Sequence, residues 1–122
     1  MTTDPSSATV AVVRRTWTSA VTASALAGCL GVLVTVPWGR VPGRAAVWGY
    51  VREALVHGWD LAVATGQDGE ADPATAEAVL AVTQQVMPAE PRGGPIPFAA
   101  PVDPRPGAGP TERLANWCGR TR

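Results

Sequence analysis

Apolar residues recur at helical spacing in several stretches of the chain, each closed by glycine or proline. The period predicts helices over four ranges: about 8–27, 44–65, 73–86 and 111–118. Between the first two helices, the β-branched run GVLVTV predicts a short strand over 31–36, and Val41 is placed to pair back with it as a hairpin. The Asp72-Pro73 pair is typical of a helix start. The pattern therefore predicts a mainly α fold with a short β-hairpin or strand.

The segment from Pro88 to Pro110 is rich in proline and glycine, a composition that excludes a regular helix. A disordered linker is one interpretation. However, Ile96, Phe98 and Val102 alternate as in an extended segment laid along an apolar surface. We therefore expect an ordered, extended Pro-rich strap over the domain.

At 122 residues the chain is long enough for one small domain. We divide it into a flexible leader, 1–7, and a single domain, 8–122. Ten arginines, with no lysine, balance ten acidic residues, so the formal net charge is zero. Zero net charge gives no indication of the basic patch of a nucleic-acid-binding protein or of a polybasic membrane anchor. We expect no nucleic-acid partner and a cytoplasmic location.

A membrane span is the main alternative for the N-terminal part. The run from Thr16 to Gly39 is uncharged, long enough to cross a bilayer and preceded by Arg14 and Arg15, a pair that also occurs in export signals. Threonine, serine and glycine dilute its apolar character, and Pro37 interrupts it. We therefore favour an amphipathic helix and expect no membrane association.

Two further groups of potential ligands lack the spacing of a metal motif. Cys29 and Cys118 are far apart, and we interpret them as reduced, partly buried thiols, with a disulfide or a reactive thiol as the alternatives. Asp68, Glu70 and Asp72 alternate as at the start of a calcium loop. The glycine and the glutamate that such a loop requires are missing, which argues against calcium.

The residue types capable of chemistry gather in the predicted central helix. Glu53 and His57 are four residues apart and Asp60 follows three later, so at about 100° per residue their side chains share one face within roughly 60°. Because this helix is apolar nearly all round, we expect it to be central and buried. A buried carboxylate and imidazole must pair, find other partners or hold a metal. Spacing alone favours a buried Glu–His hydrogen bond or a core histidine with other partners, because ExxxH is common by chance. His57 is also the only histidine of the sequence, so one chain offers no second imidazole.

Four stretches of the sequence resemble a known family over about residues 10–120. The run EALVHGWDLAVATGQDGEADPATAEAVLAV resembles the second half of the metal-binding domain of mycothiol-dependent maleylpyruvate isomerases and related DinB-like four-helix-bundle proteins. Upstream, TVPWGRVPGRAAVWGY is similar to the family's strand, turn and helix entry. Downstream, PIPFAAPVD and GPTERLANWCGR are similar to its strap and closing helix. The resemblance implies a partial DinB-like helical bundle.

The resemblance also implies a metal site. It makes Glu53 and His57 ligands of a divalent metal such as zinc, Asp60 a buried carboxylate that supports them, and Trp59 a packing residue. Tyr50, on the same side of the helix, would line the pocket. The family's remaining histidine ligand, which follows a CPGW-like motif, has no counterpart here, so the inherited site is incomplete within one chain.

The implied function is that of a metal-binding protein, with isomerase or transferase chemistry in which the metal directs a low-molecular-weight thiol onto a small-molecule substrate. A partial bundle leaves apolar helix faces uncovered. We therefore expect a homo-oligomer, or a longer product that carries the missing helices. The alternative is a non-catalytic, degenerate or truncated interaction module in which Glu53, His57 and Asp60 form a structural polar network.

Overall fold

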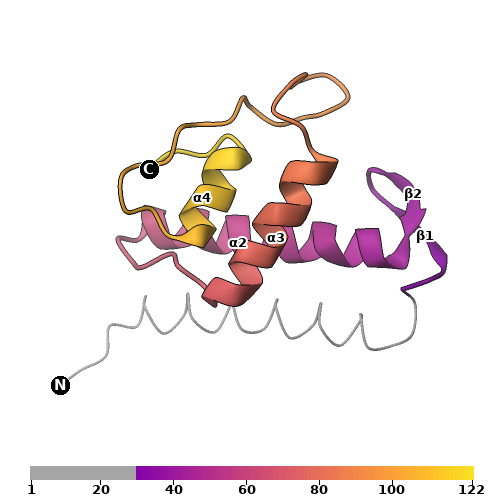
Figure 1. Ribbon diagram of the computed structural model, residues 1–122, viewed down its shortest axis with the longest axis horizontal. Coiled ribbons are helices and arrows are strands. Elements are labelled where there is room, and N and C mark those ends of the chain that lie inside the picture. Colours follow the sequence, from indigo (N-terminus) through magenta and orange to yellow (C-terminus); the bar gives the residue numbers. More distant parts are fainter. Residues whose placement is uncertain (1–29) are drawn as a thin grey trace.

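The computed structural model describes residues 30–122, so the leader, the predicted helix over 8–27 and Cys29 lie outside the described residues. The described part is mainly helical and carries one small antiparallel hairpin, as the sequence predicts (Figure 1). Its elements are β1 Leu33–Val36, β2 Gly39–Pro42, α2 Gly43–Ala64, α3 Pro73–Val86 and α4 Pro110–Trp117. None of the helices within 30–122 has the length and apolar character needed to cross a membrane.

The hairpin is anchored on the first turns of α2. Val34 of β1 lies opposite Val41 of β2, which confirms the predicted pairing. In the turn between the strands, Trp38 packs so closely on α2 that a Cβ added at Gly49 would lie 2.8 Å from its ring. The same ring contacts Tyr50, with 5.4 Å between ring centroids. A larger residue at position 49 would therefore displace the ring of Trp38 from α2.

Local signals set the ends of α2 and α3 close to their predicted positions. After α2, Gly66 has a φ of +69°, a left-handed conformation that glycine adopts without strain. Asp72 caps α3 by accepting the Thr75 N–H at 2.9 Å, and Pro73 occupies the first turn, where no N–H donor is required. The predicted start of α3 is thus confirmed.

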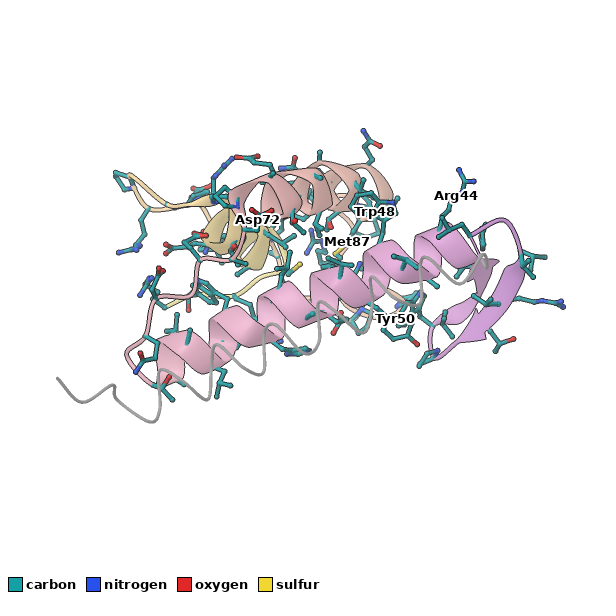
Figure 2. All side chains as sticks on the ribbon, turned by 90° about the horizontal axis from the view of Figure 1, so that it is seen from below. Arg44, Trp48, Tyr50, Asp72 and Met87 are labelled. Carbon is teal, nitrogen blue, oxygen red and sulfur yellow. The ribbon has the colours of Figure 1, made fainter. Side chains whose placement is uncertain are left out.

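Helices α3 and α4 lie on the same side of α2, and the core forms between the three (Figures 1 and 2). Trp59 of α2 is only 1% exposed, as expected for a packing residue. The core cluster consists of eight residues: Leu55, Val56, Ala76, Val79, Leu80, Met87, Leu114 and Cys118. The expectation that α2 is buried all round is wrong, because within residues 30–122 its partner helices cover one side only.

The segment between α3 and α4 is the expected extended strap. Ile96 and Phe98 pack against the core cluster, as their alternation predicts. Arg92 ties the strap to α4, because one of its terminal nitrogens, Nη1, donates to the Ala99 carbonyl at 2.9 Å and to the Trp117 carbonyl at 3.0 Å. A backbone hydrogen bond from the Val102 N–H to the Asn116 carbonyl, at 2.9 Å, adds to these side-chain bonds, so the strap is held to α4 without a regular ladder.

The acidic loop before α3 supplies helix caps. The carboxylate of Glu70 accepts the backbone N–H groups of Thr111 and Glu112, at 2.9 and 3.1 Å, at the N-terminus of α4. A carboxylate there satisfies free N–H donors and complements the helix dipole. Asp72 caps α3 in the same loop. The alternating acids that resemble the start of a calcium loop thus connect α3 and α4.

A buried carboxylate in α4 joins the strap to the C-terminal residues. Glu112 accepts two hydrogen bonds from Arg105, at 2.7 and 2.9 Å, and one from Arg122 at 3.1 Å. The hydrogen bonds from Arg105 hold the pKa of Glu112 below its ordinary value, while burial acts in the opposite sense and Arg122 adds to the lowering. The ionised form of Glu112 therefore stabilises the folded chain.

We expect this carboxylate to make stability acid-sensitive. A carboxyl whose folded pKa lies below its unfolded pKa contributes stability above the unfolded pKa, about 4.3 for glutamate, and loses it as pH falls through the folded pKa. Between pH 7 and a pH below the folded pKa of Glu112, the urea midpoint of the wild type should fall more than that of Glu112→Gln. Glu90→Gln, at an exposed strap position, is the control and should follow the wild type. Equal acid sensitivity in all three proteins would contradict the assignment.

Candidate functional site

Helix α2 brings the predicted side chains together on one face. His57 lies between two carboxylates, with its Nε2 2.9 Å from Oε2 of Glu53 and its Nδ1 3.6 Å from Oδ2 of Asp60. The first distance is that of a hydrogen bond, whereas the second is a longer electrostatic contact. The i, i+4 and i, i+3 spacings place these groups on neighbouring turns. The predicted convergence of Glu53 and His57 is confirmed.

This cluster is accessible to solvent. The His57 side chain is 61% exposed, and those of Glu53 and Asp60 are 32% and 35% exposed. The expectations of a buried ribbon and of a buried Asp60 are therefore wrong. The reason is geometric, because α3 and α4 pack on the other side of α2. The apolar pattern does not distinguish a helix that is covered on one side from a helix that is buried all round. An exposed pair is well solvated, so it does not require a metal to be stable.

Two arginines complete the electrostatics of the cluster. Arg52 Nη2 lies 3.3 Å from Oε1 of Glu53, and Arg120 Nε lies 3.3 Å from Oδ2 of Asp60. Each carboxylate thus contacts one guanidinium and the imidazole of His57. Arg52 is next to Glu53 in the sequence. The contact between Arg120 and Asp60 could not be predicted from the sequence, because no spacing rule links a residue after α4 to one in α2.

Tyr50 belongs to the same side of the helix but contacts the hairpin. It precedes His57 by seven residues, or about 10 Å along the helix axis. Its ring is 39% exposed and lies against Trp38 at an interplanar angle of 58°. Figure 2 shows Tyr50 and Trp48 on opposite sides of α2. Tyr50 and Trp38 therefore form an aromatic pair near the N-terminal end of the helix face that carries His57.

Residues 30–122 offer a metal two converging ligands, Glu53 and His57, but not the three or more ligands of a complete site. No group of three or more His, Cys, Asp or Glu side chains between residues 30 and 122 has the geometry of a metal site. Glu53 Oε2 and His57 Nε2 are 2.9 Å apart. Two ligand atoms about 2.1 Å from a tetrahedral zinc ion, about 109° apart, are separated by roughly 3.4 Å. The Glu53–His57 pair is closer together than that, so the two side chains would have to open slightly to hold such an ion.

Cys118 is not part of this centre. It is a free thiol and only 3% exposed, in agreement with the expectation of a reduced, buried cysteine. Burial raises the pKa of Cys118 to about 11, so the thiol stays protonated at neutral pH. The thiolate is the form that attacks electrophiles and binds metals. Cys118 therefore serves packing in the core.

Two proteins of Mycobacterium tuberculosis are similar to the chain: uncharacterized protein Rv0738 of strain ATCC 25618 / H37Rv and uncharacterized protein MT0763 of strain CDC 1551 / Oshkosh. Each is 34% identical to it over 94 residues, which cover 77% of the chain and 52% of the relative. The chain spans about half the length of these curated relatives. No protein-family model matches the chain, and no solved structure matches it.

Proposed function

We propose that the chain is a metal-binding protein of the mycothiol-dependent maleylpyruvate isomerase and DinB-like superfamily, in which Glu53 and His57 contribute two ligands to a divalent ion such as zinc. The observation that carries the proposal is the 2.9 Å approach of Glu53 Oε2 and His57 Nε2 on an accessible helix face. The likeness of the sequence to the family's helix and acidic-loop motif is its second support.

The neighbours of the pair have definite roles in this proposal. With Nδ1 protonated and facing Asp60 at 3.6 Å, His57 would present the lone pair of Nε2 to the ion, which would take the place of the proton in the hydrogen bond between Nε2 and Glu53. Arg52 competes for Glu53, because its Nη2 lies 3.3 Å from Oε1, although Oε2 stays directed at the imidazole. Two ligands do not complete a metal site. A second copy of the chain, or helices of a longer product, would supply the remaining ligands.

The proposed reaction is an isomerisation or transfer that uses a low-molecular-weight thiol and an electrophilic small molecule. When bound, the ion supplies the Lewis acidity that keeps such a thiol as thiolate at neutral pH. Tyr50 and Trp38 would contact the apolar part of a ligand at this face. A cytoplasmic location belongs to the same proposal, since the cytosol keeps low-molecular-weight thiols reduced.

A non-catalytic interaction module is the second candidate. It is favoured by the way Glu53, His57 and Asp60 already satisfy one another and by the two arginines that pair with the carboxylates. In this case the cluster is a solvated polar network on the surface of α2, and it recognises a partner without a metal.

Zinc titration of the full chain separates the two candidates. We expect His57→Ala and Glu53→Gln each to weaken zinc binding at neutral pH by about tenfold or more, because each removes one of two ligands. Asp103→Asn, at an exposed strap position, is the matched control and should bind as the wild type does. Zinc should also raise the melting temperature of the wild type and of the control, since a ligand that binds only the folded state stabilises it. Equal zinc affinity in all four proteins would exclude the metal role of the pair.

A further inference from the structure

The face of α2 that carries the Glu53–His57 pair has an exposed apolar side chain at each end. Tyr50 and Leu61 are each 39% exposed, and His57 between them is 61% exposed. At about 100° per residue, Tyr50 and Leu61 fall within roughly 80° of the metal pair around the helix. We call these four residues the His57 face. Large apolar side chains that flank a polar site on an exposed surface are typical of a contact with a partner.

The metal pair on this face needs ligands from outside the described part of the chain. No group of three or more His, Cys, Asp or Glu side chains between residues 30 and 122 could hold an ion, whereas zinc takes three or four protein ligands. Metal sites in helical bundles are built from side chains on facing helices. A second α2 that presents its own Glu53 and His57 would bring the ligands to four. The two carboxylates would then balance the charge of a divalent ion.

An antiparallel pair of α2 helices places unlike groups opposite each other. In a parallel pair each residue faces its own copy, so Glu53 would lie opposite Glu53, and like charges would meet. In an antiparallel pair with a two-fold axis beside position 55, Glu53 lies opposite His57 of the second copy, because both are two residues from the axis. The charges of the His57 face are thus complementary to those of a reversed copy.

The apolar ends of the His57 face match in the same register. The midpoint between Tyr50 and Leu61 along the helix differs from that between Glu53 and His57 by half a residue, or about 0.8 Å. The axis that pairs Glu53 with His57 therefore also places Tyr50 of each copy on Leu61 of the other. One register gathers four ligands and covers the exposed apolar side chains on both sides of them.

We propose that two copies of this chain pack α2 against α2 in antiparallel orientation and hold one divalent ion between them, with Glu53 and His57 of each copy as its ligands. This inference rests on the proposed function, because it names the source of the missing ligands. The contacts between Tyr50 and Leu61 at both ends keep water away from the layer of ligands. Asp60 keeps its 3.6 Å contact with Nδ1 of His57, so Nε2 remains the ligand atom.

Metal analysis and sedimentation equilibrium of the full chain test the proposal. We expect one zinc ion per two chains, and a dimer whose dissociation constant is lower in zinc than in EDTA by about tenfold or more, because zinc bound only by the dimer stabilises it. Tyr50→Lys and Leu61→Glu should each raise the dissociation constant in zinc by about tenfold or more, because each places a charge in an apolar contact. Val86→Glu, at an exposed apolar position on α3, is the matched control and should dimerise as the wild type does.

A mixture of two variants tests the antiparallel register. Position 50 of one chain faces position 61 of the other, so an equal mixture of the Tyr50→Lys and Leu61→Glu chains sets a lysine opposite a glutamate in each mixed dimer. We expect this mixture to dimerise in zinc more tightly than either variant alone. A mixture that dimerises no better than its components would contradict the register.

The outcomes separate this inference from the proposed function. A monomer that binds one zinc ion per chain would overturn the shared site and leave the metal role of the pair standing. A dimer equally tight in EDTA and in zinc, or unaffected by both Tyr50→Lys and Leu61→Glu, would also overturn the shared site. A wild type that binds no zinc would remove both proposals. If circular dichroism shows that Tyr50→Lys unfolds the chain, the comparison of Leu61→Glu with Val86→Glu decides alone.

Discussion

Trp59→Ala is expected to lower the free energy of unfolding by about 3–5 kcal/mol, the range for removal of a large aromatic side chain from a packed core. Trp59 is 1% exposed and lies where α2 meets the acidic loop. The fit is so close that a Cβ added at Gly69 would lie 2.5 Å from its ring. The cavity left by alanine cannot close without moving this loop, which carries the Glu70 cap of α4. Urea denaturation followed by circular dichroism measures the loss.

Two further variants serve as controls for Trp59→Ala. Trp38→Ala is the control for loss of an indole, and we expect a cost of about 1–2 kcal/mol, because Trp38 is 49% exposed. Trp59→Phe should cost less than Trp59→Ala, since it keeps most of the volume and removes a buried N–H that has no hydrogen-bond partner within residues 30–122. A Trp59→Ala protein no less stable than Trp38→Ala would contradict the central position of this side chain.

Gly119→Ala is expected to destabilise the chain by about 2–5 kcal/mol through two separate effects. Gly119 ends α4 with a φ of +83°, a left-handed conformation that costs a residue with a Cβ about 1–2 kcal/mol. The new Cβ would also lie 2.7 Å from Cβ and 2.8 Å from the carbonyl oxygen of Ala99 in the strap. Overpacking of this kind typically costs a further 1–3 kcal/mol.

Gly107→Ala separates these two effects. Gly107 has a similar φ of +78°, but an added Cβ there would meet nothing within 4 Å. It should therefore show the backbone cost alone, about 1–2 kcal/mol. The difference between the two variants in urea denaturation measures the contact of the strap with the end of α4. Equal losses would show that this contact tolerates a methyl group.

The position of Gly119 also connects the strap to the candidate site. Arg120 follows it directly and lies 3.3 Å from Asp60 of α2. A shift of the strap against the end of α4 in Gly119→Ala would therefore move Arg120 as well. The electrostatics around His57 thus depend on a turn that is more than 50 residues away in the sequence.

Short-range signals were sufficient to predict most elements and one contact of the site. Gly66 and the Asp72-Pro73 pair mark helix ends through backbone conformation and capping, which involve neighbours within a few residues. The hairpin followed from its β-branched run and tight turn. Glu53 and His57 meet because a helix always brings residues four apart onto one face. These predictions needed no knowledge of how the helices pack.

Long-range packing was needed for everything else at the site. Nothing local indicates that Arg120 pairs with Asp60, or that Glu70 caps α4 about 40 residues later. An apolar pattern shows which residues avoid water, but it does not show how many sides of a helix find a partner. The sequence thus predicted the stripe on α2, whereas its exposure follows from α3 and α4 sharing one side. The physical reason is that helix geometry is set by hydrogen bonds to near neighbours, while exposure and ion pairing depend on which distant surfaces meet.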